Sequence, residues 1–249
     1  MKTVFEKTTA LTDTPFHYCP GCTHGIIHRI VGEVLEELNI LEDTIGVTPV
    51  GCAGFIEQYF TIDFQGGAHG RAPAVATGIK RAQPDKIVFT YQGDGDMASI
   101  GTAEAIHAAA RGEKITTIFV NNGIYGMTGG QMAPTSIIGQ KTSTSPYGRD
   151  ANMTGYPLDL PLLISHIPGA AYVASVSVDT PQNVIKAKRA IKKAFEIQMQ
   201  GLGFTMVSVL STCPTNWGMS PTQSLKWLQE NLKENFTLGE LKAPEMVQK

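Results

Sequence analysis

Two kinds of apolar segment alternate along the chain, and this alternation is the feature that most constrains the fold. Short apolar runs predict strands, and longer segments with apolar residues at helical spacing predict helices. The strands are expected at 44–50, 86–91, 115–120, 171–178 and 204–210, and the helices at 24–39, 71–82, 100–111, 181–200 and 221–235. Strands that alternate with helices at this spacing form βαβ units. The sequence therefore predicts an α/β fold with a mostly parallel sheet and helices on both faces.

Length and composition favour a single domain. The 249 residues suit one α/β domain and leave little room for two. With 42% hydrophobic and 17% charged residues, the chain can bury a core. No repeat or linker interrupts it. We therefore expect residues 1–249 to form one domain, with a polar N-terminal arm that leads into a Cys-x-x-Cys motif and a helix near the C-terminus.

Charge and hydropathy exclude two classes of partner. The formal net charge is −2 and no cluster of Lys and Arg stands out, so no nucleic-acid surface is expected. The sequence contains no run of about 18 apolar residues, so no transmembrane helix is expected. Residues 1–7 also lack the apolar core of a signal peptide. We therefore expect a cytoplasmic protein that does not bind membranes.

Unusual residues follow four of the predicted strands. They are Gly51-Cys52, Gly93-Asp94-Gly95, Asn121-Asn122 and Cys213. In open parallel sheets, ligands bind beyond the carboxyl ends of the strands. Four such signals at one edge of a sheet indicate a shared functional site.

An aspartate between two glycines, followed by a pair of asparagines, suits a metal-bound phosphate. Gly93 and Gly95 let the backbone approach a phosphate, while Asp94 and Asn122 offer hard oxygen ligands to Mg²⁺. The helix expected from residue 100 would point its N-terminus toward the same site and favour an anion. A lone Gly-Asp-Gly is often only a turn. Two ordinary polar turns are therefore the alternative interpretation.

Four cysteines, Cys19, Cys22, Cys52 and Cys213, indicate a metal or redox role, because the cytoplasm keeps thiols reduced. A Cys-x-x-Cys before a helix can form a redox-active disulfide, but Cys52 and Cys213 would then be unexplained. Four thiolates can also hold Zn²⁺, although its ligands usually come as two close pairs. One close pair with two isolated cysteines fits a [4Fe–4S] cluster.

The spacing of Gly93-Asp94-Gly95 and Asn121-Asn122 resembles the signature of thiamine-diphosphate enzymes. In that signature, the two motifs are separated by one helix and one strand, as they are here. The resemblance implies that Asp94, the Asn122 side chain and the backbone carbonyl of Ile124 bind the Mg²⁺ that accompanies thiamine diphosphate.

The cysteine pattern resembles the beta subunit of 2-oxoacid:ferredoxin oxidoreductases. The shared features are Cys-Pro-x-Cys-x-x-Gly from Cys19 to Gly25, a third cysteine further on, and a fourth near the last strand. Segments 68–72 (Ala-His-Gly-Arg-Ala) and 125–135 (Tyr-Gly-Met-Thr-Gly-Gly-Gln-Met-Ala-Pro-Thr) also match, and the resemblance covers roughly residues 16–235. It implies that all four cysteines hold a [4Fe–4S] cluster close to the thiamine cofactor.

The same resemblance implies a set of cofactor contacts. They are Gly51, Cys52, His69, Gly93, Asp94, Gly95, Asn122, Thr128 and Gly129. His69 is the candidate catalytic residue, with an ordinary structural histidine as the alternative. Thr128 and Gly129 suit the diphosphate, because small residues permit close approach of the backbone.

The resemblance implies oxidative decarboxylation of a 2-oxo acid with coenzyme A, which gives acyl-CoA, CO₂ and reduced ferredoxin. It also implies partners: an alpha subunit with the pyrimidine-binding half of the thiamine site, gamma and ferredoxin-like delta subunits, and ferredoxin. Residues 51–56 offer no cation to a distal carboxylate. Because an unpaired carboxylate is costly to bury, pyruvate or a branched-chain oxo acid is favoured and 2-oxoglutarate stays open.

Two other classes of protein stay open at this point. One is a non-redox thiamine-diphosphate lyase or transferase subunit whose cysteines bind structural zinc. The other is a non-catalytic metal-binding module in which Gly-Asp-Gly is only a turn. His24 and His28 lie one helical turn apart, a spacing that can bind a metal, but we expect them on the surface of their helix.

Overall fold

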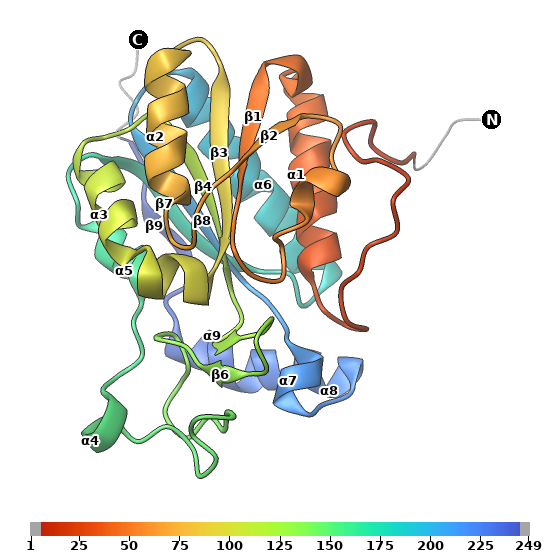
Figure 1. Cartoon of the computed structure of the whole chain (residues 1–249), viewed down its shortest axis with the longest axis vertical. Helices are drawn as coiled ribbons and strands as arrows, with labels where there is room; N and C mark the ends of the chain where they lie inside the picture. Colours follow the sequence, from red (N-terminus) through yellow and green to blue (C-terminus); the bar gives the residue numbers. More distant parts are fainter. Residues whose placement is uncertain (1–5, 245–249) are drawn as a thin grey trace.

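The computed structural model describes residues 6–244 and contains a seven-stranded sheet (Figure 1). The strands are β1 (Thr44–Thr48), β2 (Asp63–Gly66), β3 (Ile87–Gly93), β4 (Thr116–Asn121), β7 (Ala170–Ser177), β8 (Phe204–Leu210) and β9 (Gly239–Lys242). Their order across the sheet is β2-β1-β3-β4-β8-β7-β9. All neighbours pair in parallel except β9, which runs antiparallel to β7. The predicted α/β fold with a mostly parallel sheet is confirmed.

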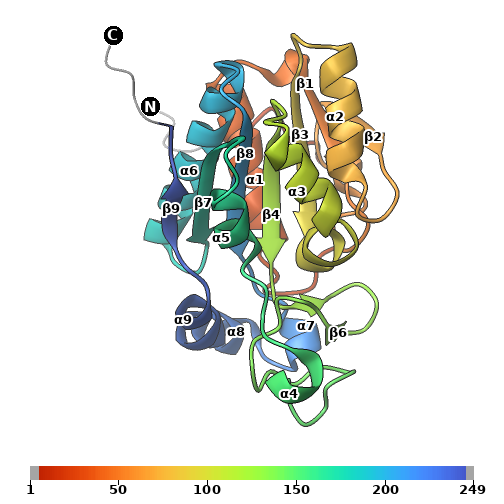
Figure 2. The ribbon, with the colours of Figure 1, turned by 90° about the vertical axis from the view of Figure 1, so that its left-hand side faces the viewer.

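Helices cover both faces of this sheet, as Figures 1 and 2 show. One face packs against α1 (His24–Glu37) and α6 (Pro181–Met199), and the other against α2 (Ala72–Ala82), α3 (Thr102–Ala110) and α5 (Leu160–Ser165). Each face has its own apolar core. Tyr91 and Phe195 are fully buried in the first core, and Phe119 and Met206 in the second.

The two central strands show why strands could be predicted from the sequence. Every residue of β4 and β8 is buried, because helices lie on both sides of them. Strands in this position read as continuous apolar and β-branched runs, without the alternation of a half-exposed strand. All five strands predicted from the sequence form.

Beyond the carboxyl ends of the strands, residues 123–159 and 213–238 form a smaller lower lobe, at the bottom of Figure 1. Its elements are β5 (Ile124–Tyr125), β6 (Gln131–Met132), α4 (Ala151–Thr154), α7 (Pro214–Trp217), α8 (Pro221–Trp227), the π-helical turn η4 (Leu228–Leu232) and α9 (Lys233–Asn235). Ile137, Leu228 and Phe236 are buried in its core together with Leu210 at the end of β8. The lobe therefore packs directly under the edge where the functional residues were expected.

The long segment 129–156, which is rich in Gly, Ser, Thr and Pro, is mostly irregular apart from β6 and α4. Arg149 holds it together from inside. Its guanidinium is buried and donates to the backbone carbonyls of six residues, Ala133, Pro134, Ser136, Thr154, Gly155 and Tyr156, at 2.6–3.4 Å. One side chain thus replaces the regular hydrogen bonding that this segment lacks.

The helix expected from residue 100 begins earlier than predicted. A π-helical turn, η3 (Asp96–Ile100), precedes α3 and is closed by a hydrogen bond from Gly101 N to Asp96 O. Gly101 lies against the backbone of Gly70, where an added Cβ would come within 2.5 Å of the Gly70 carbonyl oxygen. The wider turn therefore occurs where two backbones meet closely.

Several short elements were not predicted: β2, β5, β6, α5, α7, β9 and the 3₁₀ turns η1 (Leu41–Asp43) and η2 (Ile56–Gln58). Within residues 6–244, no helix has both the length and the apolar character needed to cross a bilayer.

Candidate cofactor site and cysteine group

A cavity of about 110 Å³ opens at the carboxyl ends of β1, β3 and β4, and we call it the cofactor cavity. Its lining includes most of the residues predicted to contact the cofactor: Gly51, Cys52, His69, Gly93, Asp94, Gly95, Asn122, Ile124 and Thr128. Gly129 follows Thr128 but does not line the cavity, and the cofactor contacts of all these residues stay predictions. The fold thus brings four separate parts of the chain to one place.

Asp94 directly follows β3 and is only 2% exposed. Its carboxylate accepts hydrogen bonds from the backbone N–H of Gly95 at 2.8 Å, the N–H of Ile124 at 3.2 Å and the hydroxyl of Thr135 at 2.6 Å. These donors are all neutral, and no cationic side chain in the described part of the chain pairs with it. Burial raises the pKa of Asp94 to about 6. A buried carboxylate without a counter-ion fits a site for a cation.

The neighbouring oxygens suit magnesium. The Asn122 side-chain oxygen accepts from the N–H of Ile124, at 3.2 Å, and the same N–H reaches Asp94. One carboxylate, one amide oxygen and one backbone carbonyl are hard ligands of the kind Mg²⁺ takes beside a phosphate.

Glycines leave room on the open side of the cavity. A Cβ added at Gly51 or Gly93 would meet nothing within 4 Å. At Gly95, by contrast, it would stand 2.3 Å from the ring of Tyr125, so this glycine is needed for packing. Two of the cavity's glycines therefore face open space, where a diphosphate could approach the backbone.

His69 lines the cavity and is held by a residue that the sequence did not single out. Its Nδ1 lies 2.5 Å from a carboxylate oxygen of Asp96, which also accepts from Gly70 N–H at 2.8 Å. The other oxygen of Asp96 accepts from the side-chain amide of Gln92 at 2.6 Å. Asp96 therefore fixes the ring and leaves Nε2 available to the cavity. Its position two residues after Asp94 was the only signal in the sequence.

The four cysteines, which we call the cysteine group, come together from three parts of the chain. All are free thiols, and only Cys19 is exposed. Burial, and then the neighbouring thiols, raise the pKa of Cys22 to about 12 and that of Cys52 to about 11. These groups are therefore protonated thiols at neutral pH, and as thiolates they would need a bound cation to compensate their charge. Within residues 6–244, no three His, Cys, Asp or Glu side chains are already placed to hold one metal ion.

Hydrogen bonds place the N-terminal motif beside the end of β8. The hydroxyls of Thr23 and Ser211 lie 2.6 Å apart, and Thr212 donates to the carbonyl of Gly21 at 2.6 Å. Cys19 and Cys22 are thereby brought next to Cys213.

Gly126 lies where the cysteine group and the cofactor cavity meet. A Cβ at this position would stand 3.0 Å from Cys52 Sγ, 3.5 Å from Cys213 Sγ and 3.8 Å from Asn122 Nδ2. Asn216, which the sequence did not reveal, donates to the Gly126 carbonyl at 2.7 Å and to Cys213 Sγ at 3.3 Å. Two cysteine sulfurs thus adjoin the cavity.

The expectation that His24 and His28 lie on the helix surface is wrong, since both are buried. His24 Nδ1 lies 2.8 Å from the hydroxyl of Tyr91, and His28 Nε2 lies 2.6 Å from that of Tyr18. Burial lowers the pKa of His24 to about 4. The polar N-terminal arm covers this side of α1, where Phe16 and Tyr18 pack against the His28 ring.

Comparison with known proteins agrees with this geometry. Residues 49–209 match the family model described as "Thiamine pyrophosphate enzyme, C-terminal TPP binding domain". This range contains the whole cofactor cavity apart from His24, and the third cysteine.

Two curated relatives cover most of the chain. The ketoisovalerate oxidoreductase subunit VorA of Methanothermobacter thermautotrophicus is 48% identical over 94% of this chain and 49% of its own length. The 2-oxoglutarate synthase subunit KorB of Methanocaldococcus jannaschii is 41% identical over 87% of this chain and 78% of its own length. The chain therefore spans about half the length of the ketoisovalerate oxidoreductase relatives it matches.

A solved structure shares the fold over nearly the whole chain. It is 2-oxoglutarate:ferredoxin oxidoreductase from Magnetococcus marinus with 2-oxoglutarate, coenzyme A and succinyl-CoA bound. The TM-score is 0.76 at 27% identity, over 97% of this chain and 86% of that one. From the family match, the relatives and this structure, we conclude that the chain belongs to the 2-oxoacid:ferredoxin oxidoreductase family and has its thiamine pyrophosphate-binding domain.

Proposed function

We propose that this chain is the thiamine-diphosphate-binding beta subunit of a 2-oxoacid:ferredoxin oxidoreductase. The reaction is oxidative decarboxylation of a 2-oxo acid with coenzyme A, which yields acyl-CoA, CO₂ and reduced ferredoxin. The observation that carries the proposal is the contact of the two sites: Cys52 belongs to the cysteine group and also lines the cofactor cavity. A carboxylate–amide cation site beside a group of four thiols suits a cofactor that gives electrons to a cluster.

The residues of the cavity have separate roles in this proposal. Asp94, the Asn122 side chain and the Ile124 carbonyl hold Mg²⁺, while Gly51, Gly93, Thr128 and Gly129 accommodate the diphosphate. Cys19, Cys22, Cys52 and Cys213 hold a [4Fe–4S] cluster. When bound, thiamine diphosphate supplies the electron sink for loss of CO₂, and the cluster accepts electrons one at a time.

His69 is the residue of this chain best placed to move a proton. The Asp96 carboxylate accepts a hydrogen bond from Nδ1–H, so Nε2 is the nitrogen that can take or give a proton in the cavity. Only the ring edge opposite Asp96 is then available to a substrate.

The lining of the cavity favours a monocarboxylic substrate. No Lys or Arg is among its described lining residues, so a second carboxylate would have no counter-ion from this chain. We therefore propose a branched-chain 2-oxo acid or pyruvate, with 2-oxoglutarate as the alternative if a partner supplies a cation. The named substrate of the 48% identical relative, ketoisovalerate, is of the branched-chain class. Relative turnover of 2-oxoisovalerate, pyruvate and 2-oxoglutarate by the assembled enzyme tests this choice.

The chain supplies only part of a thiamine site. The cavity of about 110 Å³ is well below the ~300–1,000 Å³ typical of small-molecule pockets. We propose that residues 1–249 act as one domain and that an alpha subunit covers the cavity with the pyrimidine-binding half. Gamma and ferredoxin-like delta subunits complete the assembly, which works in the cytoplasm with ferredoxin.

Metal analysis of the anaerobically purified complex tests the proposal. We expect about four iron and four sulfide per copy of this chain, after subtraction of clusters on partners. Cys52→Ala and Cys213→Ala should each lower this content. Thr215→Ala, an exposed change two residues after Cys213, is the matched control and should leave it unchanged. Zinc without sulfide would contradict the proposal and favour a non-redox thiamine enzyme.

A further inference from the structure

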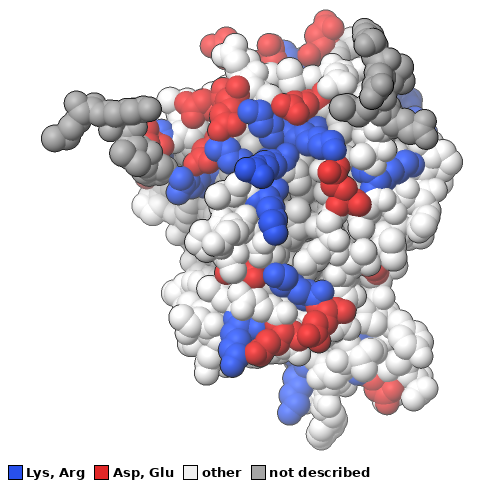
Figure 3. Space-filling view, turned by 180° about the vertical axis from the view of Figure 1, so that it is seen from behind, with Lys and Arg blue, Asp and Glu red and all other residues white. Residues whose placement is uncertain are grey.

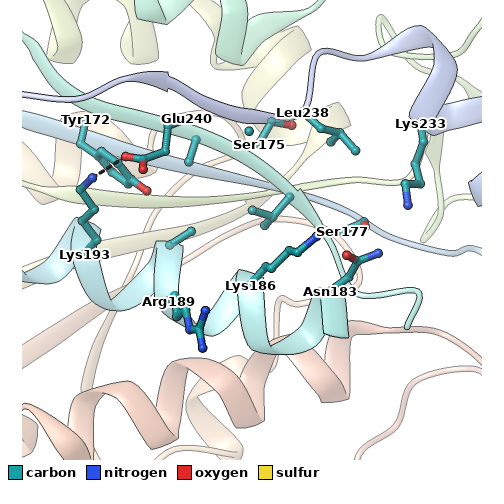
Figure 4. Close-up of a pocket in the computed structure, with 14 residues that line it drawn as sticks. Tyr172, Ser175, Ser177, Asn183, Lys186, Arg189, Lys193, Lys233, Leu238 and Glu240 are labelled. Carbon is teal, nitrogen blue, oxygen red and sulfur yellow. Dashed lines mark hydrogen bonds and ion pairs between the residues drawn. The ribbon is translucent and has the colours of Figure 1, made fainter. Parts of the chain in front are cut away.

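A second cavity lies outside the cofactor site. It measures about 530 Å³ and lies between α6 and strands β7 and β9, with Lys233 of α9 at one end (Figure 4). None of its lining residues lines the cofactor cavity. Seen from behind the molecule, basic side chains lie above and below a hollow (Figure 3). We call this space the basic cavity.

Four cations line the basic cavity, and two carboxylates pair with them. Lys193 pairs with Glu240 and lies 5.2 Å from the centre of the Tyr172 ring, and Lys233 lies 3.3 Å from Asp179. Lys186 and Arg189, both exposed on α6, form no hydrogen bond or ion pair within the described residues. The cavity therefore has an excess of positive charge.

The rest of α6 shows that this excess is local. Lys188 and Lys192 point to the other side of the helix, toward α1. Lys188 lies 2.7 Å from Glu33 and 2.6 Å from Glu37, and Lys192 lies 3.1 Å from Glu37. The basic residues outside the cavity are thus paired, whereas two of those inside it are not. A uniformly solvated basic helix surface would not separate the two groups in this way.

Apolar groups form the floor between these cations. Tyr172, Ala174 and Val176 of β7 face Ala190 of α6, and Leu238 closes one side. Asn183 adds an amide at the far end, where Figure 4 shows it beside Ser177. A ligand that matches this lining has an anionic group and an apolar or planar organic part.

We propose that the basic cavity binds a phosphorylated small organic molecule. The cations exceed the carboxylates by two, and a phosphate monoester has about 1.5–2 negative charges at neutral pH. The volume lies within the ~300–1,000 Å³ of small-molecule sites. Lys186 and Arg189 bind the phosphate, and the apolar floor receives the organic part. This site does not depend on the proposed redox function, because it shares no residue with the cofactor cavity.

Calorimetric titration of ADP into the full chain, with thiamine diphosphate and Mg²⁺ already at saturation, tests the proposal. The double variant Lys186→Gln/Arg189→Gln should weaken ADP binding about tenfold or more, because two charge-assisted contacts are lost. The matched control Lys188→Gln/Lys192→Gln removes the same charge from the same helix outside the cavity. It should change the affinity by no more than about twofold. Inorganic phosphate should bind at least about tenfold more weakly than ADP, since it leaves the apolar floor empty.

A parallel titration with coenzyme A distinguishes two candidate ligands of the basic cavity. Tighter binding of coenzyme A than of ADP, with the same loss in the cavity variant, would make the ligand the co-substrate. Tighter binding of ADP would make it a nucleotide effector. Either result supports the proposal.

Three outcomes would overturn it: no binding of ADP, equal loss in both double variants, or inorganic phosphate that binds as tightly as ADP. Loss of co-purifying partner subunits in Lys186→Gln/Arg189→Gln, without any ADP binding to the unmodified chain, would assign the cavity to a protein contact. Iron content and thiamine-diphosphate binding are measured on the same variants. They should not change, so failure of this proposal remains distinct from failure of the redox function.

Discussion

The Asp94 side chain is held by hydrogen bonds, yet its charge has no counter-ion among residues 6–244. Its carboxylate accepts three neutral hydrogen bonds, yet no cation compensates its charge within the described residues. Hydrogen bonds alone do not replace the hydration that a buried charge loses. When ionised, the residue therefore destabilises the empty cavity, and a bound cation would offset this effect.

This predicts an unusual dependence of stability on pH. The folded-state pKa of Asp94 is about 6, against 3.8 in its usual range, so the folded chain binds this proton more tightly than the unfolded chain. The stabilisation is fully present below pH 3.8 and is lost as the pH rises through 6. The loss is about 3 kcal/mol at ~1.4 kcal/mol per pKa unit. Urea unfolding of the cofactor-free chain across this range should show the decrease.

Asp94→Asn removes the titrating group and should flatten that profile. We expect Mg²⁺ and thiamine diphosphate to raise the melting temperature of the unmodified chain, and the variant should lose this rise. Asp85→Asn, on an exposed turn, is the control for loss of one carboxylate. An unchanged rise in melting temperature for Asp94→Asn would rule out the metal role.

Asp96 should act as a positioning residue for His69. Asp96→Asn places an amide group where the His69 Nδ1–H and the Gln92 amide need acceptors. We expect kcat of the assembled enzyme to fall about 100- to 10,000-fold, as when a proton-transfer histidine loses its orienting carboxylate. KM for the 2-oxo acid should change by less than about threefold. A fall in melting temperature with kcat unchanged would indicate a purely structural role.

The sequence predicted those site residues whose signal is local. Gly93, Asp94 and Asn122, which line the cavity, were singled out because a glycine or a side chain able to bind a metal follows an apolar run. Asn216 has no such motif, and its role comes from the Gly126 carbonyl and Cys213 that folding places beside it. The burial of His24 and His28 likewise depends on where the N-terminal arm lies.

Among the secondary-structure elements, strands that are buried on both faces were the easiest to predict from the sequence. The central strands β4 and β8 were predicted because helices pack on both of their faces, and strands buried in this way consist of continuous apolar runs. β9 was missed because Gly239–Lys242 is short and largely exposed, and its strand form depends on pairing with β7. The early helical turn η3 was missed because its π form depends on the contact between Gly70 and Gly101.

The lower lobe should depend on Arg149 more than on any exposed residue of the same segment. Arg149→Lys keeps the charge, but an ammonium has three donors and cannot reach six carbonyls. We expect the free energy of unfolding to fall by about 2–4 kcal/mol, with faster proteolysis within 133–156. Tyr147→Ala, at a 98% exposed position of this segment, should cost less than about 0.5 kcal/mol. Equal effects of the two changes would contradict the assigned role of Arg149.

For the whole molecule, the cysteine group joins the N-terminal arm, the end of β1 and the end of β8. If it holds a cluster, that cluster fixes the arm to the sheet. Removal of iron with a chelator under anaerobic conditions should then make the arm near Phe16 more susceptible to chymotrypsin. Cleavage within 133–156 should change little, because Arg149 holds that segment independently of the thiols. An arm that stays protected after loss of iron would show that Thr23 and Thr212 suffice to hold it.

The bonds that join the arm to the end of β8 also affect how the protein is made. Thr23 and Ser211 are separated by 188 positions, and Gly21 and Thr212 by 191. Contacts of such high contact order form late, after the intervening sheet has folded. During synthesis, Cys19, Cys22 and Cys52 leave the ribosome long before Cys213 does. If the cysteine group holds a cluster, iron must be delivered after Cys213 has been made, and the earlier thiols must stay reduced until then.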